Sequence, residues 1–191
     1  MACNAASHVK EDVLLIKGKE VILRYAQLPD LETLVYFANN AELKGDYVRT
    51  LLKSPSAFKK EFEANGFSSE SSELFVITDL TNQILGVIGH FSTVHYSSAR
   101  ELGFSIFSSD SKNKGLATEA VKLLTQYLFE GLPINRIQIC MPMEHKACEK
   151  VAIKAGYTKE GVARGAIFVK GCYLDTFVYS MLRDEFVQLS R

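Results

Sequence analysis

The stretch from Glu101 to Ala120 constrains the fold of this chain more than any other, because it passes from a strand pattern through a polar turn into a helix pattern. Leu102, Phe104 and Ile106 alternate with small or polar residues, which is the period of a strand with one buried face. Residues 108–111, with the sequence SSDS, break this alternation as a turn. Apolar residues at helical spacing then follow from residue 116 onward. The stretch therefore predicts a strand, a turn and a helix that begins between residues 114 and 117.

The start of this helix has the composition of an anion-binding site. The first turn of a helix leaves backbone N–H groups without helix partners, and the helix dipole favours negative charge there. Lys112 and Lys114 add positive charge, while Gly115 and Ala117 let a ligand oxygen approach the backbone. We expect a phosphate here, although two lysines and a glycine before a helix also form an ordinary solvated cap. The chain has no Gly-x-x-x-x-Gly-Lys-Ser/Thr loop, and Gly103 lies too far from Gly115 for a dinucleotide fingerprint.

The segments around this stretch follow a characteristic order. A buried-type strand, INRIQICMPME, spans residues 134–144, a short helix spans residues 145–155, and Gly156 and Tyr157 come next. Earlier in the chain, residues 21–24 begin a strand and residues 83–89 form a glycine-spaced apolar run. This order resembles the GNAT superfamily of acetyl-CoA-dependent N-acetyltransferases, and most closely the branch that contains the ribosomal-protein N-terminal acetyltransferases. The resemblance covers about residues 18–185.

The resemblance implies an α/β (α+β) fold in which helices flank a mixed central sheet of six to seven strands. It implies one domain at residues 18–185, after a partly flexible N-terminal extension of residues 1–17 and before a tail of residues 186–191. The fourth and fifth strands, residues 100–107 and 134–142, should splay apart around a bulge and leave strand edges for a pantetheine arm. A tight turn at residues 79–83 should join two strands as a hairpin. We expect the other strands at residues 20–26, 73–79, 84–96, 157–169 and 172–182 and helices at residues 30–39, 55–65, 114–130 and 145–155.

Acetyl-CoA is the co-substrate that the resemblance implies. The family's cofactor loop usually begins with arginine or glutamine and continues with glycine and then glycine or alanine, and here Lys112, Gly115 and Ala117 take these positions. Lysine keeps the charge but loses the bidentate geometry of arginine, so backbone N–H groups should carry more of the pyrophosphate contacts. His145 stands where the family often has an asparagine that binds pantetheine, or it simply begins its helix. The cofactor-binding residues carried over are Ile106, Phe107, Lys112, Asn113, Lys114, Gly115, Leu116, Ala117, Thr118 and His145.

Direct transfer of an acetyl group to an amine needs a base for the ammonium and a donor for the leaving thiolate. Glu101 is the expected base, because family members often place a carboxylate at the start of this strand; an exposed or merely substrate-orienting role carries equal weight. Cys148 is the expected donor, since it stands where the ribosomal-protein branch has a serine, although a cysteine on a short helix is more often part of the core. The tyrosine that many superfamily members use is replaced by Ala152.

Three functions stay open on the sequence alone. The preferred one is an N-acetyltransferase whose acceptor is a primary amine, either a small molecule or a protein N-terminus such as that of a ribosomal protein. The departures at Lys112, His145 and Ala152 also fit a degenerate domain that binds acetyl-CoA as a sensor, and a scaffold without a cofactor is the third. The acceptor region that the resemblance implies includes aromatic residues that core packing explains equally well, namely Tyr47, Phe58, Phe62, Phe67, Phe168 and Tyr173.

The composition sets wider limits. The 191 residues, 47% of them hydrophobic, suit one domain with a sizeable core. The 22 acidic and 22 basic residues cancel, which argues against nucleic acid as a partner. No apolar run reaches a membrane span and the first residues lack the regions of a signal peptide, so we expect no membrane partner and a cytoplasmic location. The four cysteines lack metal-site spacing and suit reduced thiols. A homodimer is compatible with the sequence but has no feature that indicates it.

Overall fold

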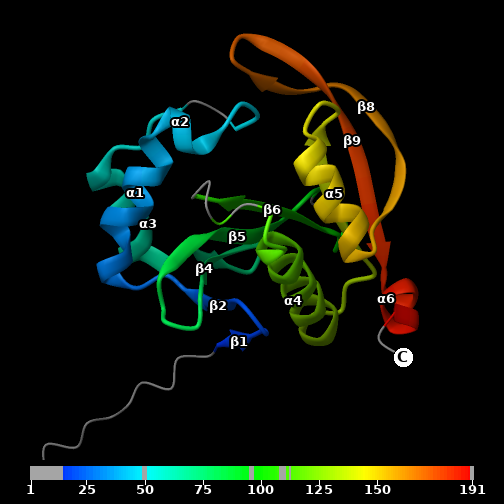
Figure 1. Cartoon of the computed structure of the whole chain (residues 1–191), viewed down its shortest axis with the longest axis horizontal. Coiled ribbons are helices and arrows are strands. Elements are labelled where there is room, and N and C mark those ends of the chain that lie inside the picture. Colours follow the sequence, from blue (N-terminus) through cyan, green and yellow to red (C-terminus); the bar gives the residue numbers. More distant parts are fainter. Residues whose placement is uncertain (1–14, 49–50, 95–96, 108–110, 112, 190–191) are drawn as a thin grey trace, which may run out of the picture.

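A computed structural model describes residues 15–48, 51–94, 97–107, 111 and 113–189 (Figure 1). In these residues, nine strands form one sheet in the order β1-β2-β4-β5-β6-β7-β9-β8, with β3 paired to β4. The parallel pair β6 and β7 lies among antiparallel pairs, so the sheet is mixed and the expected fold class is confirmed. The strands are β1 (Ile16–Lys17), β2 (Ile22–Tyr25), β3 (Ser68–Ser69), β4 (Ser72–Thr78), β5 (Ile84–Ser92), β6 (Arg100–Ile106), β7 (Arg136–Pro142), β8 (Thr158–Val169) and β9 (Cys172–Leu182).

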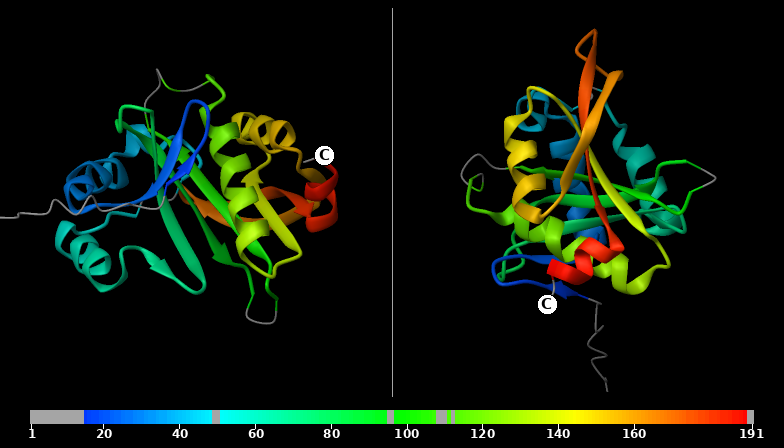
Figure 2. Two further views of the ribbon diagram at one scale, coloured as in Figure 1. Left: turned by 90° about the horizontal axis from the view of Figure 1, so that it is seen from below. Right: turned by 90° about the vertical axis from the view of Figure 1, so that its right-hand side faces the viewer.

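Helices cover both faces of the sheet. Figure 2 shows α1 and α3 on one side and α4 and α5 on the other. On the α4 side, the strand residue Leu102 and the helix residues Val121 and Leu124 belong to one buried cluster. On the α1 side, Phe107 belongs to a smaller cluster with residues of α1 and α3. The helices are α1 (Leu31–Asn39), α2 (Ala41–Lys44), α3 (Pro55–Asn65), α4 (Leu116–Gly131), α5 (Lys146–Ala155) and α6 (Arg183–Leu189), and a 3-10 turn, η1 (Leu28–Asp30), precedes α1.

Strands β6 and β7 separate soon after they start, and this opening positions the site. They pair only at Arg100 with Ile137 and at Glu101 with Gln138. The expected splay is therefore confirmed, but the expected bulge is wrong for β6. Its pairing with β5 runs without a register shift from Ser92 opposite Arg100 to Gly86 opposite Ile106. Beyond this point each strand keeps its outer neighbour, since β7 stays paired with β9 up to Pro142 and β6 stays paired with β5 up to Ile106.

The hairpin predicted at residues 79–83 is confirmed, because β4 and β5 are antiparallel neighbours. Within that turn, the N–H of Asp79 donates to the carbonyl oxygen of Gln83 over 3.0 Å. A second hairpin, formed by β8 and β9, projects beyond the rest of the sheet (Figure 1). Its turn contains Lys170 and Gly171, both with positive φ.

Two findings at the ends of elements differ from the sequence expectations. Strand β5 ends at residue 92, short of the expected 96, although residues 95 and 96 lie outside the described part. Helix α6 spans residues 183–189 and so crosses the expected start of the tail at 186. Its residue Phe186 stacks on Phe129 of α4, with ring centroids 5.3 Å apart. Among the described residues, no helix is long and apolar enough to cross a membrane.

Candidate active site

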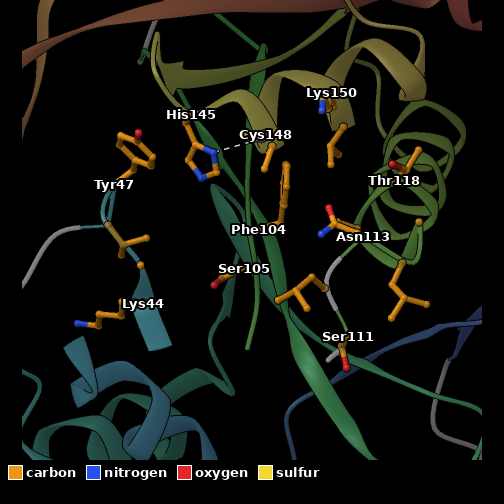
Figure 3. A pocket seen from close by; sticks show the side chains of 18 of the residues that line it. Lys44, Tyr47, Phe104, Ser105, Ser111, Asn113, Thr118, His145, Cys148 and Lys150 are labelled. Carbon is orange, nitrogen blue, oxygen red and sulfur yellow. Dashed lines mark hydrogen bonds between the residues drawn. The ribbon is translucent and has the colours of Figure 1, made fainter. Parts of the chain in front are cut away.

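A cleft of about 620 Å³ lies at the opening between β6 and β7 (Figure 3). Its walls are the last residues of β6, the first turn of α4, one side of α5 from His145 to Lys154, and residues 43–48 around the end of α2. Phe104, Ile106 and Val151 give it an apolar interior, whereas Lys150 and Lys154 bring positive charge from α5. An elongated ligand with an apolar or amide-containing arm and an anionic end would match this distribution.

The N-terminus of α4 supplies the backbone donors that the sequence predicts. Gly115 is the N-cap residue with φ +85°, and none of the described side chains caps the helix. The first helical hydrogen bond joins the N–H of Glu119 to the carbonyl oxygen of Gly115 over 3.0 Å, so the N–H groups of the three preceding residues have no helix partner. A Cβ built on Gly115 would meet no atom of the described residues within 4 Å. The arrangement therefore fits the pyrophosphate of coenzyme A, which needs close approach to backbone N–H groups.

Most of the expected cofactor-binding residues on this loop line the cleft. They are Asn113, Gly115, Leu116, Ala117 and Thr118. Lys114 is exposed and is not among the lining residues, and Lys112 lies outside the described residues. The sequence reasoning missed Lys150 and Lys154. Their spacing of four residues, which places both on one side of α5, is the signal that could have found them.

His145 and Cys148 meet at the first turn of α5. The His145 Nδ1 atom accepts a hydrogen bond from the backbone N–H of Cys148 over 3.2 Å, so this imidazole is the N-cap of the helix (Figure 3). Because Nδ1 is an acceptor, the neutral ring carries its hydrogen on Nε2. The ring also contacts Tyr47, with centroids 4.6 Å apart. Burial raises the pKa of the Cys148 thiol to about 12, so this thiol stays protonated at neutral pH.

The strand contacts differ from the expected pair by one residue. Phe104, Ser105 and Ile106 line the cleft, whereas Phe107 is buried on the other face of the sheet. Its ring stacks on Phe37 of α1 with centroids 4.0 Å apart. Successive side chains of a strand point to opposite faces, so Ile106 and Phe107 cannot both face the cleft. Ser105 reaches the cleft because it lies where β6 has lost its β7 neighbour.

Glu101 lies at the closed end of the opening, beyond the residues that line the cleft. It is the last β6 residue that pairs with β7, directly opposite Gln138. The Gln138 Nε2 atom donates a hydrogen bond to Glu101 Oε2 over 2.7 Å. The carboxylate is half-buried on the sheet face opposite α4, since it alternates with the buried Leu102. An arm that filled the cleft along β6 would end near this carboxylate.

The aromatic residues expected near an acceptor divide into two groups. Tyr47 lines the cleft, but Phe58, Phe62 and Phe67 pack together beneath α1 as core. Phe168 and Tyr173 contact each other in a tilted arrangement at the exposed end of the β8–β9 hairpin, with centroids 5.1 Å apart. Only Tyr47 thus reaches the cleft among the described members of this set.

The known proteins that this chain resembles in sequence or structure are acetyltransferases. A family model described as an acetyltransferase (GNAT) domain matches residues 20–158. A Bacillus subtilis (strain 168) protein named "Putative ribosomal N-acetyltransferase YdaF" is 27% identical over 151 residues, which cover 79% of this chain and 77% of that protein. The RimL ribosomal L7/L12 alpha-N-protein acetyltransferase, solved with coenzyme A, aligns with a TM-score of 0.77 at 20% identity over 90% of this chain and 99% of its own. Spermidine N-acetyltransferase from Vibrio cholerae, solved with CoA and spermine, aligns with a TM-score of 0.76 at 18% identity over 87% and 98% of the two chains.

The splayed strands and the open N-terminus of α4 define the class of protein as an acyltransferase that uses a coenzyme A thioester. The match of the family model to most of the chain makes the assignment specific: the chain belongs to the acetyltransferase (GNAT) family. It is an N-acetyltransferase, and acetyl-CoA is its co-substrate.

Proposed function

We propose that this enzyme transfers the acetyl group directly to a primary amine at the closed end of the β6–β7 opening, with Glu101 as the base. The observation that carries the proposal is the order of three features along the opening. The open donors of α4 lie at one end, the cleft beside β6 follows, and the Glu101 carboxylate lies where the strands meet.

In this proposal, the α4 end of the cleft holds the cofactor. The N–H groups of Leu116, Ala117 and Thr118 bind the pyrophosphate, and Lys150 and Lys154 supply charge nearby. The edge of β6 at Ser105 and Ile106, which has no β7 partner there, offers backbone groups to the pantetheine amides. Bound acetyl-CoA supplies an acetyl group already activated as a thioester.

Two side chains assist the acetyl transfer, one as the base and the other as a hydrogen-bond donor. Glu101 takes the proton of the acceptor ammonium, directly or through one water, because amines are mostly protonated at neutral pH. The Cys148 thiol keeps its proton, so it can donate a weak hydrogen bond to the departing sulfur. His145, with its hydrogen on Nε2, orients the pantetheine arm from the same turn of α5.

The acceptor belongs to one of two classes of primary amine. The name of RimL states that it acetylates the α-amino group of a ribosomal protein, and the Vibrio cholerae enzyme is named for spermidine. Both classes present an amine on an extended chain, which could reach Glu101 from the face opposite α4. The proposal therefore includes a protein N-terminus and a small polyamine as acceptors.

A degenerate acetyl-CoA sensor is the second candidate, and one observation favours it. Ala152 is fully buried in the core, so no hydroxyl stands where many family members place their donor. The raised pKa of the Cys148 thiol, which is due to burial, also makes it a poor acid. A sensor would bind acetyl-CoA but would not turn it over with any amine.

Release of coenzyme A from acetyl-CoA, measured with a panel of acceptors, tests these candidates. The panel contains spermidine, a peptide with a free N-terminus and the same peptide with a blocked N-terminus. Turnover with the free peptide alone supports a protein N-terminus, and turnover with spermidine alone supports a polyamine. Saturable binding of acetyl-CoA with no turnover on any amine would refute the enzyme proposal in favour of the sensor.

We also propose that the reaction takes place in the cytoplasm and that residues 18–185 form the catalytic domain. The support for the first point is chemical. The three cysteines in the described residues are all free thiols, which is the usual state in a reducing compartment.

A further inference from the structure

A chain of polar side chains runs across the sheet from Glu101 to its far edge. Gln138 on β7 donates to Glu101 over 2.7 Å, and its Oε1 atom accepts from Arg136 Nη2 over 3.1 Å. Arg136 in turn forms a bidentate ion pair with Glu160 on β8, with Nη2 and Oε2 2.6 Å apart. Ser180 on β9 donates to Glu160 over 2.8 Å. Four strands therefore contribute to one connected network that ends at the Glu101 carboxylate.

The chemistry of the network allows Gln138 only one orientation. A guanidinium has donors and no acceptor, so the Gln138 atom that faces Arg136 must be the carbonyl oxygen. A carboxylate has acceptors only, so the atom that faces Glu101 must be the amide nitrogen. A flipped amide would lose both hydrogen bonds at once. The direction of the Gln138 dipole is thus set by Arg136, which Glu160 holds in place.

We propose that Gln138 is a positioning residue that holds the Glu101 carboxylate ready for the acceptor amine, and that Arg136 fixes the orientation of Gln138. This inference rests on the proposed role of Glu101 as the base. A glutamate side chain at the edge of an opening can adopt several rotamers. A hydrogen bond from one amide donor limits these rotamers and leaves the carboxylate charged. Gln138 also leaves the second carboxylate oxygen, Oε1, available for the ammonium of the acceptor.

Other charged and titratable groups close to Glu101 define what the amide contributes. Cys140, on the same face of β7, accepts a contact from Gln138 Nε2 at 3.5 Å. Burial, and then the Glu101 charge, raise the pKa of the Cys140 thiol to about 12, so this neighbour is neutral at neutral pH. Arg136 is the nearest cation of the network, but Glu160 balances its charge. The Cys140 thiol also hydrogen-bonds Glu101, so the Gln138 amide and this thiol both contact the carboxylate without changing the net charge beside it.

Replacement of Gln138 by glutamate tests the inference, because it keeps the shape and reverses the interaction with Glu101. Two adjacent carboxylates oppose each other's ionisation. The acidic limb of the pH profile of kcat/KM should move up by about one pH unit, while the dissociation constant for acetyl-CoA stays within about twofold of the wild-type value. The more drastic Gln138→Ala change removes a donor to the carboxylate, so it should move this limb up by less than Gln138→Glu does. It should also lower kcat about tenfold, because the base is no longer held in position.

The chain offers a matched control for the glutamate variant. Gln126, exposed on α4, donates to Glu130 over 2.9 Å, so Gln126→Glu creates the same pair of carboxylates away from the site. This control should leave the pH profile unchanged. Arg136→Lys should also lower kcat, as Gln138→Ala does. The reason is that a lysine ammonium cannot donate to Glu160 and Gln138 together in the way that the planar guanidinium does.

Several outcomes would overturn the inference. An unchanged pH profile and kcat in Gln138→Glu, in a variant that binds acetyl-CoA normally, would show that Gln138 does not act on the base. An equal shift of the acidic limb in the Gln126→Glu control would show that the added negative charge acts from anywhere on the protein, and not through contact with Glu101. Failure of the proposed function would look different, because the wild-type enzyme itself would then show no turnover with any amine, or Glu101→Gln would retain full turnover.

Discussion

At the residue scale, the buried thiols give a direct test of the local environment. Cys172 is exposed, whereas burial raises the thiol pKa values of Cys140 and Cys148 to about 12. Alkylation requires the thiolate, so these two partly buried thiols should remain almost unreactive below about pH 10. With iodoacetamide at pH 8, peptide mass mapping should show Cys172 modified well before Cys140 and Cys148.

The urea-unfolded protein provides the control for this labelling, since all of its thiols should react at similar rates. Labelling of Cys148 as fast as Cys172 in the folded protein would contradict the environment described for the α5 turn. It would also remove the argument that Cys148 keeps its proton during the reaction.

A second residue-scale prediction concerns Glu101. The Glu101→Gln side chain has nearly the same size and can still form hydrogen bonds, but it cannot accept the proton of an ammonium. We expect kcat/KM at neutral pH to fall about 100-fold, with the loss shrinking at high pH, where the free amine is more abundant. The dissociation constant for acetyl-CoA should not change, because Glu101 lies beyond the residues that line the cleft. Steady-state kinetics from pH 6 to about pH 10 would measure this.

Glu130→Gln on the exposed face of α4 is a suitable control, since it removes one carboxylate away from the opening. A Glu101→Gln enzyme with the wild-type rate at neutral pH would eliminate Glu101 as the base. The enzyme would then have to use water or the amine's own free fraction.

Single residues also mark how far the sequence could predict the site. The place of Gly115 at the start of the helix was predictable, because it lies between a polar turn and a helical pattern. Its φ of +85° agrees with this prediction. Gln138 was not predictable, because its partner Glu101 is 37 residues away and meets it only through the register of β6 and β7. Phe107 was misplaced because the resemblance supplied a position without the direction in which the side chain points.

At the element scale, the end of α4 depends on one side chain from α6. The Arg183 guanidinium donates to the carbonyl oxygens of Phe129, Leu132 and Ile134 over 2.6, 2.6 and 2.8 Å. The first carbonyl lies in the last turn of α4, the helix that begins at the proposed pyrophosphate site, and the other two lie in the segment between α4 and β7. Arg183 thus joins α6, the end of α4 and the start of β7.

Arg183→Ala should therefore lower the free energy of unfolding by about 2–3 kcal/mol, because it leaves several carbonyl groups without a donor. Arg183→Lys should recover only part of this loss, since an ammonium cannot reach three carbonyls arranged around a planar fork. Urea unfolding would measure both variants. Arg164→Ala on exposed β8 is the control, and an equal loss in it would refute the role of Arg183 as a cap.

The elements also differ in how well the sequence predicts them. Helix α4 was clear because five of its apolar residues repeat at helical spacing and lie fully buried or nearly so. Helix α6 was missed because its seven residues have no N-cap signal, and its Phe186 is stabilised by stacking on Phe129 rather than by local pattern. The bulge in β6 was expected from the family, but the uninterrupted pairing with β5 removes the need for it.

At the scale of the whole molecule, two acidic groups tie the first strands together. Asp30 forms a buried bidentate ion pair with Arg24, at 2.6 and 3.0 Å, and Glu73 accepts from His90 over 2.9 Å. Burial alone would raise their pKa values. Hydrogen bonds from Arg24 to Asp30, and from His90 and Tyr25 to Glu73, outweigh burial and hold both pKa values below the usual range.

The sign of the pH dependence follows from these lowered pKa values. A carboxyl whose pKa is lower in the folded state contributes its full stabilisation above the unfolded-state pKa of about 4, and loses it as the pH falls. The free energy of unfolding should therefore decrease steeply from about pH 5 downward. Glu73→Gln should flatten this slope, whereas the exposed Glu61→Gln should leave it unchanged. A slope in Glu73→Gln equal to that of the wild type would contradict the account of this cluster.

Two glycines with positive φ provide the pair of variants that tests the location of the acetyl-CoA site. Gly115 and Gly66 have φ values of +85° and +61°, and a Cβ at either one meets nothing within 4 Å. Valine should therefore strain the backbone similarly at both positions. Only the Gly115→Val side chain would stand among the donors at the start of α4.

The most direct test of the central claim is a thermal-unfolding titration of these two variants and the wild-type protein with acetyl-CoA. At about 100 times the dissociation constant, the ligand should add about 2.7 kcal/mol and raise the midpoint of the wild type and of Gly66→Val by roughly 5–10 °C. Gly115→Val should show little or no shift at the same concentration. An equal shift in all three proteins would place the acetyl-CoA site away from the N-terminus of α4.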